Sequence, residues 1–521
     1  MTPSRAGGWK KDLAAGTAFF LIAFFFAFSW GWDFSDDSWL LQVANRLVSD
    51  DALYRQVYLH VTPLSVYLLA LPTVIFGPEM LSLKIEIALV FAAIVVVACL
   101  INEQLGAQRR YSPAFILALF AFASPARMML VSYYSQVATF FLLASFSAWL
   151  SWRADGDRRR LYLAGALLGA CFAAKQNTGV FGVLALMVAE GARAFADRER
   201  AKSPITNLAA PAAAFVIVVA ILLSPVILTG AFADMVFQGF TGRGPYLQYG
   251  SVSYAWPILS LREVAADPLS LNALRFINGA IPFLLPFALL PLFLFVRAYS
   301  DSKERGLLIA VVAFSAAALA IMFPRSDPHH MIFAMPMLIL ATAYCWRRLP
   351  QVYAAGGART VRFAAIAVAA GVMASMTLGA IQRVKPSVGI ISNIPHFRGL
   401  VIPRYLHEPL THNNSALAAF PRDGKTLLLG AHASMYYVAG DMTNPTKYDY
   451  PTIISLKSSG NKEVMEMIRD GRVKHVCLTA GDEPTLEPVD LKRWIRASMV
   501  RLPAPDFCEH YARREDMGAT R

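Results

Sequence analysis

The sequence of 521 residues is poor in charged side chains, and this shortage excludes an ordinary soluble domain. Only 16% of its residues are Asp, Glu, Lys or Arg, whereas soluble domains carry about 25%. Hydrophobic residues make up 56% and the mean hydropathy is +0.46, which is the composition of a membrane protein. The net charge of +13 does not indicate nucleic-acid binding, because the basic residues lie mostly in short loops between apolar runs.

Cysteine is also scarce, and this argues against a zinc site. The five cysteines form no CxxC pair and no Cys/His spacing that would ligate zinc. Cys99, Cys171 and Cys345 lie in or beside apolar segments and are interpreted as small buried hydrophobes.

Long apolar runs, in contrast, recur along the chain, and about 20 residues suffice for one membrane crossing. The run from Asp12 to Trp30 is too long for a signal-peptide core and lacks a small-residue cleavage site, so it is predicted to be a membrane anchor. Eleven crossings are predicted, at 12–30, 81–101, 113–131, 135–152, 161–176, 177–192, 207–230, 271–297, 306–323, 329–346 and 360–382.

One further run, 61–77, is short and carries two prolines, and the basic residues decide its place. If it lies at the outer interface, every arginine-rich loop faces the cytoplasm, as the positive-inside rule requires. These loops are Arg109-Arg110, Arg158 to Arg160, Arg193 to Lys202, Arg297 to Arg305 and Arg347 to Arg362. The N-terminus is then inside and the C-terminus outside.

The chain is thus expected to be an α-helical polytopic membrane protein, residues 1–382, followed by a small outer α/β domain, residues 383–521. The segments 425–430 and 474–479 have the composition of buried strands. Residues 461–470 have the periodicity of an amphipathic helix, ended by the glycine that follows.

Cys477 and Cys508 both fall in this outer region, which is an oxidising compartment. They are predicted to lie close enough for a disulfide. Two buried free thiols remain the alternative, because Cys477 falls in a predicted buried strand.

The first outer loop, residues 31–80, begins with three acids in the stretch WGWDFSDDSWLLQVANRL. Helix capping is one explanation, since Ser35 is a good N-cap and acids in a first turn suit the helix dipole. Capping needs only one acid, however. The alternative is that Asp36 and Asp37 supply a catalytic carboxylate just above the bilayer.

Other outer segments carry polar groups that a simple anchor would not need, and such groups usually face a cavity or a water-filled site. They are Tyr54, Arg55 and His60 in the first loop, Lys175, Gln176 and Asn177 in AAKQNTG, Arg243, Tyr246, Gln248 and Tyr249 in TGRGPYLQYG, and Arg325, Asp327, His329 and His330 in FPRSDPHHMIF.

Some of these groups also have a plainer interpretation. Lys175 and Arg325 could extend along apolar surface to reach water. His329 and His330 are adjacent, so on a helix they point about 100° apart and do not ligate one metal together. A polar wall that faces phosphate is favoured over a metal site for this loop.

A carboxylate and several cations at one membrane face suit one kind of chemistry. The carboxylate can accept a proton from an attacking hydroxyl, and the cations can neutralise a phosphate leaving group. A phosphate-linked donor anchored in lipid would need this arrangement near the interface. Lys175 and Arg325 are therefore predicted to bind the donor phosphate.

Residues 35–77 resemble the opening signature of the C-type superfamily (GT-C fold) of membrane glycosyltransferases. Within it, the likeness is to protein O-mannosyltransferases and bacterial lipid A aminoarabinose transferases (glycosyltransferase family 39). The signature comprises an acidic pair, an amphipathic helix, a Tyr-Arg step, a proline before an interfacial helix, and Phe-Gly. AAKQNTG and PRSDPHHMIFAMP resemble further outer loops of the family, and HASMYYVAGDMTNPTKYDYP is similar to periplasmic tails of one bacterial branch.

The resemblance implies an inverting transferase in the bacterial inner membrane. It would take a sugar from a polyprenyl-phosphate donor on the periplasmic side and transfer it to a lipid, glycan or protein. Asp36 falls on the position of the catalytic base, with Asp37 as its neighbour. Many relatives carry a further acid in the second outer loop, where this chain has Tyr133, Ser135 and Gln136. A cofactor is not indicated, although a divalent cation is left open.

Two other classes of protein were weighed against the enzyme. A transporter or flippase of a lipid-linked or anionic solute would be expected to show paired repeats and broken helices at mid-membrane. The ionisable groups cluster at one face here, which favours the enzyme. A non-catalytic assembly protein stays open because of the missing acid in the second outer loop.

Overall fold

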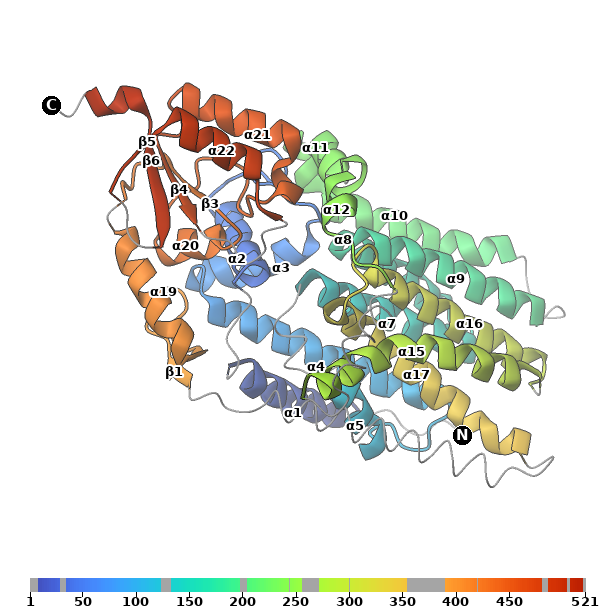
Figure 1. Cartoon of the computed structure of the whole chain (residues 1–521). Coiled ribbons are helices and arrows are strands. Elements are labelled where there is room, and N and C mark those ends of the chain that lie inside the picture. Colours follow the sequence, from blue (N-terminus) through green and yellow to red (C-terminus); the bar gives the residue numbers. More distant parts are fainter. Residues whose placement is uncertain are drawn as a thin grey trace.

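The computed structural model describes residues 8–28, 34–122, 133–196, 204–242, 244–254, 271–298, 300–353, 389–418, 420–479, 486–503 and 507–518. A bundle of long helices forms one part of the molecule, and a small sheet with its own helices forms the other (Figure 1). The helices of the bundle are α1 (Gly8–Phe28), α4 (Met80–Gln104), α5 (Pro113–Phe122), α7 (Tyr133–Asp155), α8 (Arg158–Ala174), α9 (Gln176–Ala196), α10 (Pro204–Leu228), α15 (Leu271–Ala298), α16 (Ser302–Leu319) and α17 (Pro328–Tyr353).

Five helices of the described residues are long and apolar enough to cross a membrane, which identifies a multi-pass membrane protein. They are α4, α7, α9, α10 from Asn207 to Leu228, and α16 with the short helix η3 (Ala320–Met322). Helices α1, α5, α8, α15 and α17 cover further predicted runs, and the run 360–382 lies outside the described residues. The number of eleven crossings stays a prediction.

The first outer loop folds into two short helices, α2 (Asp36–Val48) and α3 (Leu64–Phe76). At 13 residues, α3 is about 20 Å long, which is less than the hydrocarbon thickness of about 30 Å. Its residues Leu64, Val66 and Leu69 are buried, whereas Leu71 and Val74 are exposed. This length and one-sided burial suit the interfacial helix that the sequence predicts.

A third outer segment is built from α11 (Phe232–Val236), the π-helix η2 (Phe237–Thr241) and α12 (Gly244–Tyr249). It continues into a short ladder with the loop before α17, because the amide of Val252 donates to the carbonyl of Pro324, and that of Ser326 to Val252. This ladder brings the segment after α10 beside the loop that carries Arg325.

The C-terminal part contains a four-stranded mixed sheet in the order β3-β4-β6-β5. Its strands are β3 (Thr426–Leu429), β4 (His475–Thr479), β5 (Val500–Arg501) and β6 (Cys508–Ala512), and a separate hairpin pairs β1 (Gly389–Ile391) with β2 (Val401–Pro403). The helices are α19 (Arg404–Leu417), α20 (Ala433–Ala439), α21 (Ile453–Arg469) and α22 (Val489–Ser498), with a final turn η5 (Arg514–Gly518). Only β3 and β4 run parallel. Both predicted strands are confirmed, and the predicted helix 461–470 is the second half of α21.

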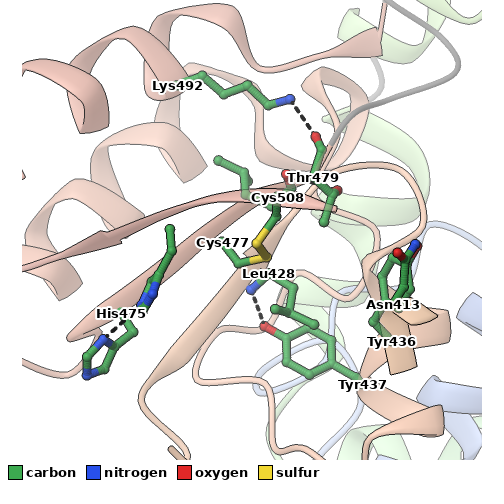
Figure 2. Close-up of a disulfide and its surroundings, with 11 residues drawn as sticks. Asn413, Leu428, Tyr436, Tyr437, His475, Cys477, Thr479, Lys492 and Cys508 are labelled. Carbon is green, nitrogen blue, oxygen red and sulfur yellow. Dashed lines mark hydrogen bonds between the residues drawn. A yellow bond between two sulfur atoms is a disulfide. The ribbon is translucent and has the colours of Figure 1, made fainter. Parts of the chain in front are cut away.

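Both faces of this sheet are covered, which explains why its central strands are continuously apolar. Leu427 and Leu429 of β3 pack into one cluster with α21 and α22. Leu428 and Cys477 point the other way and join the large core that also contains α20. Cys477 forms a disulfide with Cys508, with Cα atoms 5.6 Å apart, so the predicted pairing is confirmed (Figure 2).

The sheet domain packs against the outer loops of the bundle. Helix α20 contacts α2, and α21 contacts α12. In Figure 1, α2 and α3 accordingly lie between the sheet and the long helices. The segment that holds α2 and α3 and the segment that holds α11, η2 and α12 therefore lie between the sheet domain and the helix bundle. The candidate site lies among these two segments.

Candidate functional site

Five of the predicted site residues line one pocket between these outer segments. The pocket contains about 300 Å³ of space that no atom fills and is open in part to solvent. It is lined by His60, Val61, Tyr134, Lys175, Tyr246, Phe323, Pro324, Arg325 and His330. The first loop, the turn between α8 and α9, helix α12 and the loop before α17 thus converge, although they are far apart in the sequence.

Lys175 provides the buried cation of this pocket. Its residue is 8% exposed, in the one-residue break between α8 and α9. The ammonium donates to Ser135 Oγ at 3.0 Å and to the Ile321 carbonyl at 2.8 Å, and it lies 5.4 Å from the centre of the Tyr134 ring. A lysine held in this way faces the pocket and does not extend along the surface to bulk water.

Arg325, Asp327 and His330 form a second polar cluster at the pocket. Arg325 Nε donates to Asp327 Oδ2 at 3.0 Å, while Asp327 Oδ1 lies 2.8 Å from His330 Nδ1. Burial alone would raise the pKa of Asp327, but the hydrogen bonds from His330 and the charge of Arg325 outweigh it and hold the pKa well below its usual range. Asp327 therefore stays ionised and orients the two groups that line the pocket.

Three aromatic rings, those of Trp39, His60 and Tyr246, stack on one another and form an aromatic wall at the pocket. The His60 ring lies 5.0 Å from that of Trp39 and 5.7 Å from that of Tyr246, nearly parallel to the first. Tyr134 meets His60 edge-on at 6.3 Å. Helix α2 and helix α12 are thereby joined through His60.

Gln176 supports this wall from behind and is not among the residues that line the pocket. Its amide donates to the carbonyls of His60 and Gly239. Gln238, which the sequence analysis missed, accepts from the Leu59 amide at 3.0 Å and donates to the Tyr54 carbonyl at 2.6 Å. The two glutamines fix the backbone that leads to His60.

Tyr54 and Arg55 also lie outside the pocket lining. Tyr54 is buried, and its hydroxyl donates to the Val61 carbonyl at 2.7 Å. Arg55 is exposed and donates to the Thr229 carbonyl. Arg243 and the side chain of His329 lie outside the described residues.

The acidic pair opens helix α2, as predicted, but its two members lie in different surroundings. The Ser35 carbonyl accepts from the Trp39 amide, whereas the Ser35 side chain makes no capping hydrogen bond, so that part of the capping prediction is wrong. Asp37 is fully buried and pairs with Lys84 of α4 at 3.0 Å. Asp36 is partly exposed, and it shares a helix face with Trp39, three residues on.

The vacant position in the second outer loop has a carboxylate beside it in space. Tyr133, the first residue of α7, hydrogen-bonds to Glu86 of α4, whose Oε2 atom is buried and has no hydrogen-bond partner among the described residues. Lys84 and Glu86 lie inside a run that the sequence analysis treated as purely apolar. Two charges within six residues of a membrane helix end were the available signal.

No group of three His, Cys, Asp or Glu side chains in the described part of the chain lies close enough together to hold a metal ion. Asp327 and His330, which lie together at the pocket, bond to each other. The arrangement of described residues fits an anion better than a divalent cation, because the pocket lining includes a lysine, an arginine and two imidazoles but no carboxylate.

No protein-family model matches the sequence, and no curated protein matches it. Solved structures do match over nearly the whole chain. The crystal structure of ArnT from Cupriavidus metallidurans bound to undecaprenyl phosphate has a TM-score of 0.58 and 12% identity, and the match covers 97% of this chain and 98% of that one.

Two further structures agree. ArnT in the apo state gives a TM-score of 0.54 at 12% identity, covering 98% of each chain. The arabinofuranosyltransferase AftD from mycobacteria gives 0.53 at 12% identity, covering 98% of this chain and 40% of that one. The chain therefore has the fold of ArnT over nearly its whole length, and the fold of part of AftD, as its resemblance to polyprenyl-phosphate glycosyltransferases predicts.

Proposed function

We propose that this protein is an inverting glycosyltransferase that moves a sugar from a polyprenyl-phosphate donor to an acceptor hydroxyl at the outer face of the bacterial inner membrane. The observation that carries the proposal is the pocket where Lys175, Arg325 and His330 meet. These groups can stabilise the negative charge of a phosphate that leaves the sugar. The fold adds support, since ArnT has been solved with undecaprenyl phosphate bound.

In the proposed reaction the acceptor oxygen attacks the anomeric carbon from the side opposite the phosphate. The bond from that carbon to the phosphate oxygen breaks, and polyprenyl phosphate leaves with the bonding electrons. Lys175 and Arg325 offset the growing charge on the phosphate, and charge-assisted contacts of this kind are stronger than neutral ones. The aromatic wall of His60 and Tyr246 would shield the reacting centre from water.

Asp36 is the proposed general base. It is partly exposed, and it lies one helical turn from Trp39, whose ring stacks on His60. A carboxylate in this place can take the proton that the acceptor hydroxyl loses. Asp37 cannot serve as freely, because Lys84 already binds its carboxylate. We propose that it supports the helix that carries Asp36.

The proposed orientation places the arginine-rich loops in the cytoplasm and residues 383–521 in the periplasm. The Cys477–Cys508 disulfide supports this, since disulfides form and persist in oxidising compartments. A donor whose polyprenyl chain lies in the membrane would then reach the pocket from the outer leaflet. The acceptor class is a lipid, a polysaccharide or a protein that is exposed on the same side.

A direct assay tests the proposal. Purified protein in nanodiscs would be mixed with polyprenyl-phosphate sugars and with cell-envelope acceptors, and released polyprenyl phosphate would be measured. The expected result is release that depends on the acceptor, together with inverted configuration at the transferred sugar. Movement of the intact lipid between leaflets without release would instead identify a flippase and overturn the enzyme.

A further inference from the structure

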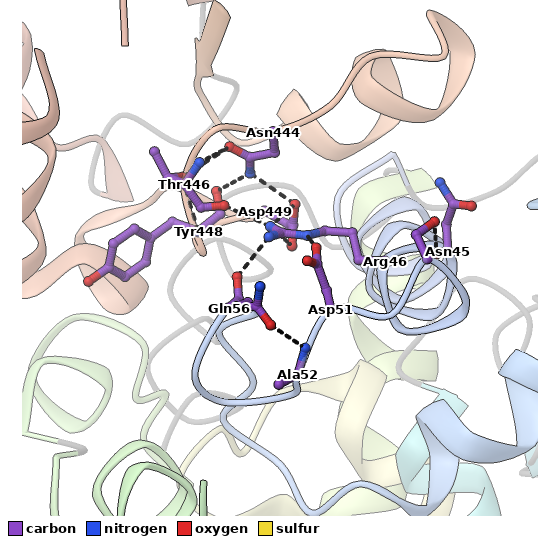
Figure 3. A network of polar contacts seen from close by, with 10 residues as sticks. Asn45, Arg46, Asp51, Ala52, Gln56, Asn444, Thr446, Tyr448 and Asp449 are labelled. Carbon is purple, nitrogen blue, oxygen red and sulfur yellow. Dashed lines mark hydrogen bonds and ion pairs between the residues drawn. The ribbon is translucent and has the colours of Figure 1, made fainter. Parts of the chain in front are cut away.

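One loop of the C-terminal domain is held in shape by hydrogen bonds among its own residues. Within the segment 444–449, Asn444 donates to the Tyr448 carbonyl and to Asp449 Oδ1, and it accepts from the amide and hydroxyl of Thr446. Asn444, Thr446 and Asp449 are all less than 5% exposed. The loop, named here the tail loop, is therefore a rigid turn that holds one carboxylate in a fixed place (Figure 3).

That carboxylate binds Arg46, near the end of the helix that Asp36 begins. Arg46 Nη1 lies 3.1 Å from Asp449 Oδ2 and donates to the Thr446 carbonyl at 2.7 Å. The same guanidinium also pairs with Asp51 at 2.7 Å and donates to the Gln56 carbonyl at 2.7 Å. Arg46 thus joins the tail loop, helix α2 and the segment after it.

The electrostatics of the pair follow from its burial. Asp449 is wholly buried, and desolvation raises its pKa even though the charge of Arg46 opposes the change. Desolvation would lower the pKa of Arg46, but Asp449 and Asp51 raise it overall. Removing Arg46 alone would therefore leave Asp449 buried without compensation, whereas Arg46 would keep Asp51 as a partner if Asp449 were lost.

The segment that Arg46 holds leads straight to the pocket. Tyr58 donates its amide to the Lys447 carbonyl of the tail loop at 2.7 Å, and its ring lies 5.8 Å from that of Tyr448. Two residues later His60 enters the pocket and stacks on Trp39. The tail loop is thus bonded to both ends of the segment 46–58, whose next residues carry a pocket wall.

A second contact from the same domain reaches the segment that leads to Tyr246, at the other end of the aromatic wall. Lys457 in α21 has a φ of 55°, a conformation that residues other than glycine rarely adopt. Its ammonium lies 4.9 Å from the centre of the Phe237 ring and 5.8 Å from that of Tyr58. Phe237 opens η2, the turn before α12, and α12 carries Tyr246. Strain of this kind persists only where the surrounding contacts hold it.

We propose that the C-terminal domain is a positioning element of the donor pocket, acting chiefly through Asp449 on Arg46. It sets the place of His60 against Trp39 and Tyr246, and so the shape of the aromatic wall that faces Lys175 and Arg325. The inference rests on the proposed function for its ligand, a lipid-linked phosphate. Arg46 and Asp449 are positioning residues, because neither lines the pocket.

The experiment separates positioning from simple stabilisation with a pair of neutralising changes. Arg46→Met leaves Asp449 buried without its partner, and Asp449→Asn leaves Arg46 with Asp51 alone. Both variants are expected to unfold at lower temperature than the native protein. The double variant removes both charges, so its thermal stability should recover most of the loss. A matched control, Arg496→Met with Glu509→Gln, removes an exposed ion pair elsewhere in the same domain.

Two measurements are made on the full-length protein in nanodiscs. Binding of undecaprenyl phosphate should be about 2- to 30-fold weaker in the double variant, the range typical of residues that act on a site from a distance, and unchanged in the control. Hydrogen exchange over residues 53–59 should be faster in the double variant, while exchange in β4 stays unchanged. Arg46→Lys keeps the positive charge but not the several donors of the guanidinium. Its lipid binding and hydrogen exchange should therefore lie between those of the native protein and those of the double variant.

Each result is decisive for one of the two ideas. A double variant that binds the lipid as tightly as the native protein, with native exchange over 53–59, overturns the positioning role. If the native protein itself does not bind undecaprenyl phosphate, the proposed function fails. The exchange measurement then still decides whether the tail loop orders the segment that leads to His60.

Discussion

Lys84 Nζ lies 3.0 Å from Asp37 Oδ2, and both side chains are wholly buried. The two residues are 47 positions apart, on the first outer loop and on a membrane helix. Because of this ion pair, the two acids at the start of α2 lie in different surroundings. The carboxylate of Asp37 is bound by a buried lysine, whereas its neighbour Asp36 remains partly exposed.

Asp36→Asn should preserve folding and remove most transfer activity. An amide caps a helix nearly as well as a carboxylate, but it cannot accept the proton of the acceptor hydroxyl. The expected loss in kcat is about 10²–10⁴-fold, which is the contribution of a positioned base. Steady-state kinetics of the purified variant would measure it. A variant that transfers sugar at the native rate would reduce Asp36 to a helix-starting residue.

Asp37→Asn should act on stability more than on chemistry. It leaves Lys84 buried without its partner, and breaking a buried pair costs about 3–5 kcal/mol. Thermal unfolding in detergent should therefore shift well below that of Asp36→Asn, while the folded fraction keeps more activity. The double change Asp37→Asn with Lys84→Met serves as the control and should regain stability. Equal stability of all the variants would contradict the buried pair.

Lys175→Ala and Arg325→Ala should each weaken use of the donor without unfolding the protein. Losing a charge-assisted contact to phosphate costs about 1.5–3 kcal/mol, or roughly 10- to 150-fold in apparent donor affinity. Arg55→Ala is the matched control, because Arg55 is exposed and lies outside the pocket lining. Unchanged donor affinity in both pocket variants would show that these cations do not contact the donor.

The C-terminal domain should lose stability as the pH falls from about 6.5 to about 4. His475 Nδ1 lies 3.2 Å from His510 Nε2, and desolvation, with the charge of His475, lowers the pKa of His510 to about 4. In that window the unfolded chain binds a proton that the folded domain does not, so acid favours unfolding. Hydrogen exchange in β4 and β6, measured across this pH range, would follow the loss of stability. His510→Phe should make the stability of the domain less dependent on pH. The same dependence in this variant as in the native protein would contradict the role of His510.

The cytoplasmic side can be tested by labelling. Asp157 lies in the short turn between α7 and α8, beside three arginines that are predicted to face the cytoplasm. A cysteine placed there should resist an impermeant thiol reagent in intact cells, whereas one at Asp441, exposed in the C-terminal domain, should react. Labelling of position 157 from outside the cell would contradict the predicted topology.

The sequence alone determined the class of protein and much of its local structure. Apolar runs and basic loops are local signals, because the bilayer acts on each segment by its length and charge. The start of a helix at Asp36, the short helix within 61–77 and the strands around 425–430 and 474–479 were therefore all predictable. The pairing of Cys477 with Cys508 was predicted from their shared compartment, with two free thiols as the alternative. The structure decided between the two, because their chain segments form neighbouring strands.

Only the tertiary structure decided which polar groups meet. Tyr54 and Arg55 are adjacent in sequence, yet the side chain of Tyr54 is buried and that of Arg55 is exposed. Lys84 lies within an apolar run of the sequence, and only the packing of α2 on α4 places it beside Asp37. Arg46 and Asp449 are 403 residues apart. Contacts of this kind leave no periodic trace in a sequence, because they depend on how separate helices and loops pack, and that packing sets the shape of the pocket.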